Sequence, residues 1–366
     1  MSDIVKQTSD VHFIVAIHAL TNSDSTPLVA IATKNTDATT KSNIYDDLES
    51  LSADYAENTG VYAQAAAMFD VNGFNGPVEV IAYPNVDSNT PSGVKSQGTT
   101  TGGTVTAAAT TTPGIVAGIT QHLFDGFKYL VLDGATETEI EALSDFLYDN
   151  QRIMLVTQPN SVTALQTLAT HVAGVQTVKN QLGNTAAIVE TATDRYPAAQ
   201  AVAYAAANLP VDFQHIGNLS QFEPDANLTT DDYDTIAGLN ATLVVNKAGD
   251  YMLLNGKALA GNYIDQFVHT QLVIDTLQTN LQKYLNRKNF PIYNDATIKE
   301  MTQTINAVST SLLQMGVLYT AIAVNSVPRS NVLNSDVIAR KYNGFSLSAQ
   351  IADDIDTINA KLDLTL

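Results

Sequence analysis

Apolar and polar residues recur along this chain with two different periods, and each period predicts a different kind of element. Apolar residues at every second position, Val11, Phe13, Val15 and Ile17, predict a strand with one buried face. Further along, short apolar runs alternate with segments of helical spacing, which favours an α/β fold with a mainly parallel sheet and helices on its faces. Strands are expected at 27–35, 77–84, 127–134, 152–159 and 185–191, and helices at 44–70, 138–150, 162–172 and 197–209.

The pattern changes after residue 228. A short helix is expected there, with Thr229 as N-cap and Gly238 at the C-cap, followed by a hairpin that turns at 247–250 around Gly249. Two long amphipathic helices follow, over about 263–288 and from Ile298 to Met315. The apolar residues of the second helix are spaced 3, 4, 3, 4, 3, which is typical of a narrow seam against another helix. Strands are expected again at 318–326 and 344–351.

The chain ends in an alternating segment, residues 356–366. Its apolar face carries Ile358, Leu362, Leu364 and Leu366. An amphipathic strand needs a partner edge, which either its own sheet or the sheet of another subunit can supply. In the second case the contact is head-to-tail, and it generates rings or helical filaments.

Composition limits the possible partners. The 366 residues carry a net charge of −19, which makes nucleic acid a poor partner. The charge is uneven: residues 1–249 hold 9 Lys+Arg against 27 Asp+Glu, net −18, and residues 250–366 hold 9 against 10, net −1. Charged residues make up only 15%, which hints that much of the surface meets protein. With no cysteine, no secretory signal and no apolar run long enough to cross a bilayer, a protein made in a cytoplasm and not inserted in a membrane is expected.

Residues 88–114 are rich in Thr, Gly and Ser and almost free of large apolar side chains. Such a segment cannot bury enough apolar surface to order itself. An exposed loop is expected there.

The sequence offers little support for catalysis or cofactor binding. The Gly-Lys pair at 256–257 lacks the upstream Gly and the following Ser or Thr of a phosphate-binding loop, so a strand-to-helix junction is expected instead. Tyr284 and Lys288 have the Tyr-x-x-x-Lys spacing of short-chain dehydrogenases. The Gly-rich dinucleotide turn of those enzymes is absent from this sequence, so the match is interpreted as accidental. The pair Asp353–Asp354 could bind calcium, but one acidic pair without further oxygen ligands is weak support for a site. A solvated turn is the favoured interpretation. No catalytic, cofactor-binding or metal residue is predicted.

The six histidines also lack metal-ligand spacing, and structural roles are expected for them. They are His12, His18, His122, His171, His215 and His269. The basic cluster Lys283, Arg287 and Lys288 has two open interpretations, complementarity to a helix C-terminus and contact with a protein partner.

The order of segments resembles contractile phage tail sheath proteins. The segments at 44–70 and 76–84, the stretch at 228–259, the two long helices and the strand-rich tail follow the same order over most of residues 40–366. No single motif is diagnostic, and the loop at 88–114 matches no motif of that family.

The resemblance implies a structural subunit of the virion tail, assembled in the host cytoplasm as stacked hexameric rings around a tail tube. It also implies contraction that drives the tube through an envelope, with baseplate and tail terminator proteins as further partners. Residues 1–30 would join residues 250–366 in an inner domain, and residues 31–249 would form an outer α/β domain. Strands at both chain ends would cross between subunits through Val11, Phe13, Val15, Ile17, Ile358, Leu362, Leu364 and Leu366.

Two other classes of protein remain open from the sequence. One is an α/β enzyme with an unrecognised active site, because fold alone does not exclude it. The other is a different self-assembling lattice protein, such as a tail tube or surface-layer subunit. The alternating strands and helices speak against a tube, for which an all-β fold is expected.

Overall fold

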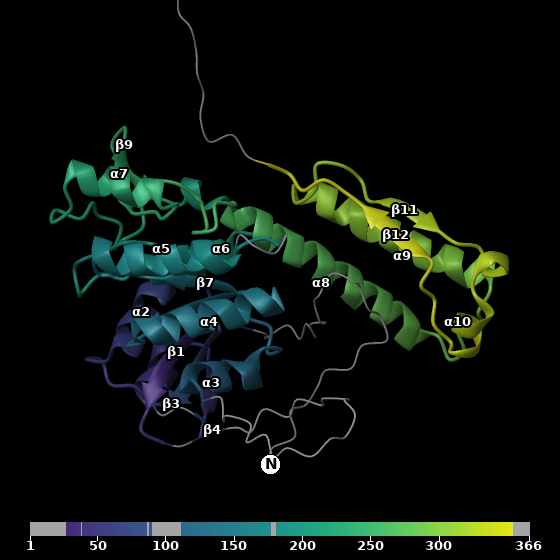
Figure 1. Cartoon of the computed structure of the whole chain (residues 1–366), viewed down its shortest axis with the longest axis horizontal. Helices are drawn as coiled ribbons and strands as arrows, with labels where there is room; N and C mark the ends of the chain where they lie inside the picture. The colour runs from purple at the N-terminus through teal and green to yellow at the C-terminus, as the bar shows by residue number, and fades with distance from the viewer. Residues whose placement is uncertain (1–26, 38, 86–87, 90–110, 177–180, 354–366) are drawn as a thin grey trace, which may run out of the picture.

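A six-stranded, mainly parallel sheet forms the centre of the molecule (Figure 1). The computed structural model describes residues 27–37, 39–85, 88–89, 111–176 and 181–353. The strand order is β2-β3-β1-β6-β7-β8, and only β2 runs antiparallel to its neighbour. The strands are β1 (Val29–Asn35), β2 (Lys41–Tyr45), β3 (Val78–Pro84), β6 (Tyr129–Asp133), β7 (Met154–Thr157) and β8 (Thr185–Ala187). The predicted α/β class with a parallel sheet is confirmed.

Helices cover both faces of this sheet, so its strands are apolar on both sides. In β1, Val29 and Ile31 face a core shared with α2 (Gly60–Phe69) and α6 (Pro197–Ala207). Ala30 and Ala32 face a second core with α3 (Gly114–His122) and α4 (Glu137–Asn150). A third core joins α5 (Val162–Gln176), α7 (Thr230–Gly238) and β9 (Val244–Lys247). Double burial of this kind explains why the parallel strands read as continuous apolar runs.

The segment predicted as one helix over 44–70 is divided into three elements, so that prediction was wrong. Tyr45 is the last residue of β2, which pairs with β3. The helices α1 (Leu48–Ser52) and α2 follow as separate elements. The side chain of Asp47 caps α1 by accepting from Ser50 N, and that of Thr59 caps α2 by accepting from Tyr62 N. Each cap starts a new helix, which the apolar spacing alone does not reveal. The helix α3 was not predicted.

Local sequence signals after residue 228 had mixed success. Thr229 caps α7 in a capping box with Asp232, and β9 and β10 (Asp250–Leu253) form the predicted hairpin, with Gly249 at φ 104°. The predicted C-cap at Gly238 was wrong: helix α7 includes that glycine, and the positive φ of 56° falls on Asn240. Asn tolerates the left-handed region better than most residues, so it serves this end of the helix.

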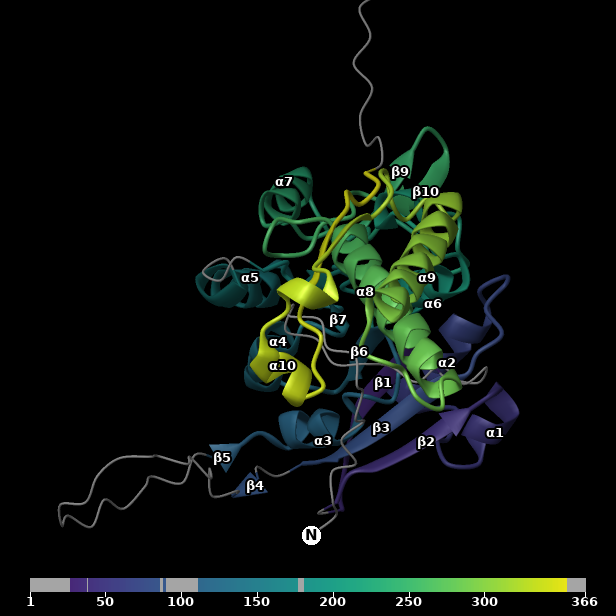
Figure 2. The same cartoon turned by 90° about the vertical axis from the view of Figure 1, so that its right-hand side faces the viewer.

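A long helical hairpin projects from the α/β region. Helix α8 (Ile264–Arg287) lies beside α9 (Asp295–Gln314), as Figure 2 shows, and both were predicted. The first turns of α8 pack into the α/β core, whereas its second half joins a separate core with α9, β11 (Ala323–Ser326) and β12 (Phe345–Ser348). The seam of α9 ends at Leu312, since Met315 is exposed. A short helix α10 (Asn334–Ile338) precedes β12.

Several predicted segments fall outside the described residues. These are the alternating segments at 11–17 and 356–366 and most of the Thr/Gly-rich loop. At the base of that loop, β4 (Ser88–Asn89) pairs antiparallel with β5 (Thr111–Thr112). The domain boundary at 249/250 stays a prediction.

Candidate assembly surface

Exposed apolar side chains gather in one part of the chain. Among the residues that the structure describes, seven of the nine large exposed apolar side chains lie between positions 290 and 338, although this stretch is a small share of the sequence. They are Phe290, Ile292, Met315, Tyr319, Val327, Leu333 and Ile338. Three of them, Phe290, Tyr319 and Ile338, are each at least 75% exposed. The seven lie at both ends of α9, since Phe290 and Ile292 precede this helix and Met315 and Tyr319 follow it. Exposed apolar side chains in such number are candidates for contact with another protein. We call these seven residues the assembly surface.

The strands that border this surface are incomplete as a sheet. Strands β11 and β12 pair only with each other in the described part of the chain, and the ladder continues through the bridge between Leu318 and Ile351. Most side chains of both strands are exposed or half-buried. A two-stranded sheet is marginally stable alone, and its open edges offer hydrogen-bonding groups to a further strand.

A cleft of about 550 Å³ opens where this ladder meets the first turns of α8. Gln266 and Thr270 of α8 line one side, and Tyr319, Gln350 and Ile351 line the other. The cleft is therefore continuous with the assembly surface through the exposed ring of Tyr319.

The three residues of the predicted basic cluster, Lys283, Arg287 and Lys288, do not share one environment. Lys288 Nζ lies 2.7 Å from Glu300 Oε2 of α9, and the Tyr284 hydroxyl donates to the same oxygen at 2.7 Å. Burial and this hydrogen bond raise the pKa of Tyr284 to about 12, the opposite of what a catalytic tyrosine needs. Lys288 thus ties α8 to α9, whereas Lys283 and Arg287 are exposed on α8.

At the carboxyl end of the sheet, where open α/β folds bind ligands, several polar side chains are engaged within the chain, and a cavity of about 150 Å³ lies beside Leu132, Gly134 and Thr157. Asp133 at the end of β6 accepts a hydrogen bond of 2.9 Å from Thr33 Oγ1 of β1. Its carboxylate also lies against the first turn of α2, where a Cβ on Gly60 would come within 2.0 Å of Asp133 Oδ1. Gln64 of the same helix donates to Leu132 O at 3.0 Å.

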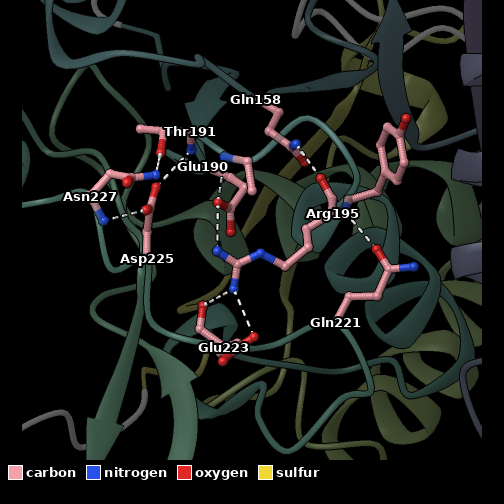
Figure 3. A network of polar contacts seen from close by, with 10 residues as sticks. Gln158, Glu190, Thr191, Arg195, Gln221, Glu223, Asp225 and Asn227 are labelled. Carbon is pink, nitrogen blue, oxygen red and sulfur yellow. Dashed lines mark hydrogen bonds and ion pairs between the residues drawn. The ribbon is translucent and has the colours of Figure 1, made fainter.

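A polar network closes the neighbouring strand ends (Figure 3). Arg195 contacts Glu190 Oε1, just after β8, at 3.1 Å and Glu223 Oε2 at 3.3 Å. Asp225 accepts from Thr191 N at 2.7 Å and from Asn227 N, so two loops are tied together. Burial raises the pKa of Glu190. Every group here has a partner within the chain, which is the pattern of a structural network.

The Gly-Lys pair lies in the β10–α8 connection, as expected. A Cβ on Gly256 would come within 2.5 Å of Asp212 Oδ1, so close packing accounts for this glycine. Lys257 Nζ lies 5.8 Å from the centre of the Tyr263 ring. Asp353 accepts a long hydrogen bond from Gln266, and Asp354 lies outside the described residues.

The histidines occupy unlike environments. His171 Nε2 lies 2.9 Å from Asp145 Oδ1, and His215 Nδ1 lies 2.9 Å from Asp212 Oδ2. Burial lowers the pKa of His269, whose ring nitrogens have no hydrogen-bond partner in the described part of the chain. His122 lies near Asp125 and Glu79. His12 and His18 fall outside the described residues.

Burial, together with repulsion from the Asp125 carboxylate, raises the pKa of Glu79 to about 7, although the hydrogen bond from Ser42 opposes this shift. The contacts with Asp125 and Glu79 raise the pKa of His122 despite its burial. His122 and Asp125 are three residues apart, but Glu79 lies more than forty positions earlier, so the sequence pattern alone does not bring the three together.

Comparison with solved structures connects this fold to contractile sheaths. The chain is similar to a chain in the baseplate of the anti-feeding prophage (AFP), 11% identical, TM-score 0.64, over 97% of this chain and 100% of that one. It is also similar to the sheath complex of the PVC extracellular contractile injection system in its contracted state, 12% identical, TM-score 0.62, over 94% and 93%. A third match is the contracted AFP helical sheath, 11% identical, TM-score 0.58, over 99% of each chain.

The likeness covers nearly the whole of each chain, so the described residues have the fold of contractile sheath proteins, as the sequence resemblance implies. No family model and no curated protein sequence matches the chain. None of the described helices is long and apolar enough to cross a membrane.

The eight residues predicted to make strand contacts between subunits all lie outside the described part of the chain, and this role stays a prediction. The assembly surface was missed. Part of its signal was present in the sequence, because Val327, Leu333 and Ile338 are apolar residues in a polar stretch that no predicted strand or helix covers.

Proposed function

We propose that this protein is a structural subunit of a contractile sheath, which polymerises as stacked rings around a tube and drives the tube through an envelope by contracting. The observation that carries the proposal is the match of the whole fold, over 94–99% of this chain, to sheath chains of contractile injection systems. A match of this extent includes the helical hairpin and its strands, which a generic α/β enzyme does not need.

The assembly surface and the β11–β12 ladder support polymerisation. A strand from another copy that pairs with this open ladder would gain main-chain hydrogen bonds and apolar contacts together. The segments at 11–17 and 356–366 have the alternating pattern for this role. Because donor and acceptor lie on different parts of the chain, the contact is head-to-tail and extends into rings and helical stacks.

The distribution of charge supports an orientation of the subunit in which one domain faces the tube and the other faces outward. The inner domain would comprise residues 1–30 and 250–366, next to the tube, and residues 31–249 would face outward. The outer segment belongs to the strongly acidic part of the chain, whereas residues 250–366 carry a net charge of only −1. Lys283 and Arg287 are exposed on the hairpin and would contact the tube protein. Baseplate and terminator proteins would bind at the two ends of the stack.

A purely structural role, with no catalysis, fits the pairing of polar groups at the carboxyl end of the sheet within the chain itself. The groups that could have formed an α/β active site there, such as Asp133 and Glu190, are engaged by Thr33 and Arg195. One of the matched sheaths belongs to an extracellular contractile injection system and another to a prophage particle. A phage tail and a related injection particle are therefore two settings for the same activity.

Electron microscopy of the purified full-length protein tests the proposal. We expect hollow tubes or stacked rings with sixfold symmetry, alone or after addition of the cognate tube protein. Flat lattices would support a surface-layer protein instead. Monodisperse globules under all conditions, with or without the tube protein, would overturn the proposal.

A further inference from the structure

Three side chains with metal-binding chemistry meet beside the sheet, and none of them belongs to the assembly surface. Glu79 lies in β3, His122 is the last residue of α3, and Asp125 lies in the turn that leads to β6. His122 Nδ1 lies 2.7 Å from Asp125 Oδ2 and 3.6 Å from Glu79 Oε1. One ligand atom from each residue lies within 4.8 Å of the other two. A single ion can therefore contact all three.

The buried carboxylate of Glu79 is incompletely satisfied, which is a separate observation from the clustering. Glu79 is 1% exposed, and its Oε1 accepts a hydrogen bond of 2.6 Å from Ser42 Oγ. Its Oε2 is buried without a hydrogen-bond partner. Among the described residues, its ion-pair partner is His122 and no lysine or arginine. A buried carboxylate without full compensation is costly, and a cation offsets that cost.

We propose that Glu79, His122 and Asp125 bind one divalent transition-metal ion, for which Zn²⁺ is the best-matched probe. One imidazole nitrogen and two carboxylate oxygens are donors that zinc accepts, with water in the fourth position. Calcium and magnesium are poorer matches, since they prefer oxygen ligands in larger number or strict octahedral geometry.

The surroundings fit a cation. His122 is at the C-terminal end of α3, where the helix dipole favours positive charge. The side chains of His122 and Asp125 are 20% and 41% exposed, so an ion can enter from solvent and keep a water ligand.

No pair of ligand atoms has to close by more than about 1.5 Å, since all lie within 4.8 Å of one another. With metal–ligand bonds of about 2.0–2.1 Å, tetrahedral ligand atoms are about 3.3 Å apart. The separation of 3.6 Å between His122 and Glu79 is already close to this value. The hydrogen bond of 2.7 Å between His122 and Asp125 must open by about 0.6 Å, which an exposed aspartate in a turn permits.

Bound metal would fasten the end of α3 and the following turn to β3. This site amends the expectation from sequence that no residue binds metal. It does not depend on the sheath proposal, because it lies within one subunit.

His171 provides a matched control. It also has two carboxylates nearby, but through different nitrogens: Nε2 lies 2.9 Å from Asp145 Oδ1, and Nδ1 lies 3.9 Å from Glu141 Oε2. No single ring nitrogen of His171 has both carboxylates close to it, so one ion cannot be held in the same way.

The experiment is zinc titration of the untagged full-length protein by calorimetry, with bound metal counted by elemental analysis after dialysis. We expect one saturable zinc site per chain and a rise in Tm of about 3 °C or more at saturating zinc. His122→Asn and Asp125→Asn should each lower the zinc affinity at least tenfold. His171→Asn should bind as the wild type does. His12 and His18 are present in every variant, so differences between variants report the proposed site.

X-ray absorption at the zinc edge gives a second readout, with N/O ligands at about 2.0–2.1 Å expected. Both substituted side chains at the proposed site are at least partly exposed, and circular dichroism checks that each variant is folded. Wild-type protein without saturable zinc binding would overturn the proposal, as would folded His122→Asn protein that binds zinc with unchanged affinity.

Discussion

The α/β region and the helical hairpin region contain the same types of apolar residue but differ in how many of these side chains they bury. In residues 27–263, three cores bury nearly all large apolar side chains, and Ile44 and Tyr251 are the exceptions among the described residues. In residues 264–353, one smaller core holds α8, α9 and two strands together, while seven large apolar side chains remain exposed. Folding of the first region buries most of its large apolar side chains. The second retains large apolar side chains that the described part of the chain leaves exposed.

Helix α8 joins these two regions and carries buried polar groups at the junction. Asp275 of α8 forms an ion pair with Lys128, just before β6, and both side chains are largely buried. Burial lowers the pKa of Lys128, although the Asp275 carboxylate opposes that shift. This contact ties the hairpin to the α/β region by charge as well as by packing.

The largest expected effect concerns assembly alone. Deletion of residues 356–366 should abolish polymerisation and leave a folded, soluble subunit. The apolar face Ile358, Leu362, Leu364 and Leu366 would contribute on the order of 6–12 kcal/mol per contact before ordering costs. Sedimentation and circular dichroism report the two properties separately. Leu364→Asp is a gentler version, because it adds a charge to the apolar row without shortening the chain.

A sharp drop in Tm after the deletion would mean that this strand completes its own subunit's sheet. Undiminished tubes would contradict any role for it in assembly.

A large effect on stability is expected from the α/β core. Phe213 is fully buried, with its ring 5.9 Å from that of Tyr129. Phe213→Ala should lower the free energy of unfolding by about 3–5 kcal/mol, because it removes packed atoms and leaves a cavity. Phe290→Ala, at a residue that is 76% exposed, is the matched control and should change it by less than about 0.5 kcal/mol. Urea denaturation of unassembled protein measures both, and equal losses would erase the contrast between the regions.

The junction should give stability a pH dependence. Burial, and then repulsion from Asp212, raises the pKa of Asp265 in the first turn of α8 to about 6, from an ordinary 3.8. The folded state therefore binds the proton more tightly, and stability is lost as pH rises from about 4 through 6. Asp265→Asn removes this loss, and it should raise the free energy of unfolding by about 1–3 kcal/mol at pH 8 and leave it unchanged below pH 4.

Urea midpoints at pH 4 and pH 8 measure this effect, with Asp234→Asn on the exposed side of α7 as control. A gain that is the same at both pH values would point to packing rather than ionisation.

A single residue of the assembly surface should affect association more than folding. Ile338→Ser should weaken polymerisation about tenfold or more, since one buried Ile contributes roughly 1.5–3 kcal/mol. Ile44→Ser, on β2 and 53% exposed, is the matched control, and it should leave polymerisation unchanged. Critical concentrations from light scattering decide the comparison. Equal effects of Ile338→Ser and Ile44→Ser would show that the clustering of exposed apolar residues at 290–338 has no role in polymerisation.

The smallest effect is expected at the Thr/Gly-rich loop. Replacement of residues 90–110 by a short Gly/Ser turn, with the β4–β5 pairing kept, should change the free energy of unfolding by about 0.5 kcal/mol or less. Limited proteolysis should cut the native protein first within this segment. Resistance to cleavage there, or a large loss of stability, would contradict the exposed loop expected from composition.

Local signals in the sequence determined much of the fold. Continuous apolar runs predicted β1, β3, β6 and β7 because both faces of a parallel sheet are buried. Thr229 with Asp232 marked the start of α7, and Gly249 marked a turn, since both act through neighbouring backbone. The order of these elements was enough to indicate the fold of sheath proteins. The prediction for residues 44–70 failed because two caps and an edge strand overrode the apparent helical period.

Only the tertiary structure decided which apolar residues stay exposed and which distant side chains meet. The regular apolar spacing predicted for α9 includes both Ile305, which is fully buried, and Met315, which is 43% exposed, so the period alone does not distinguish them. Burial depends on what packs opposite, and that is set by elements far apart in sequence. Glu79 and Asp125 come together with His122 for the same reason: β3 and the end of α3 lie side by side because the chain crosses over the sheet between them. A sequence records the period of each element, whereas contacts between elements exist only once the sheet has formed.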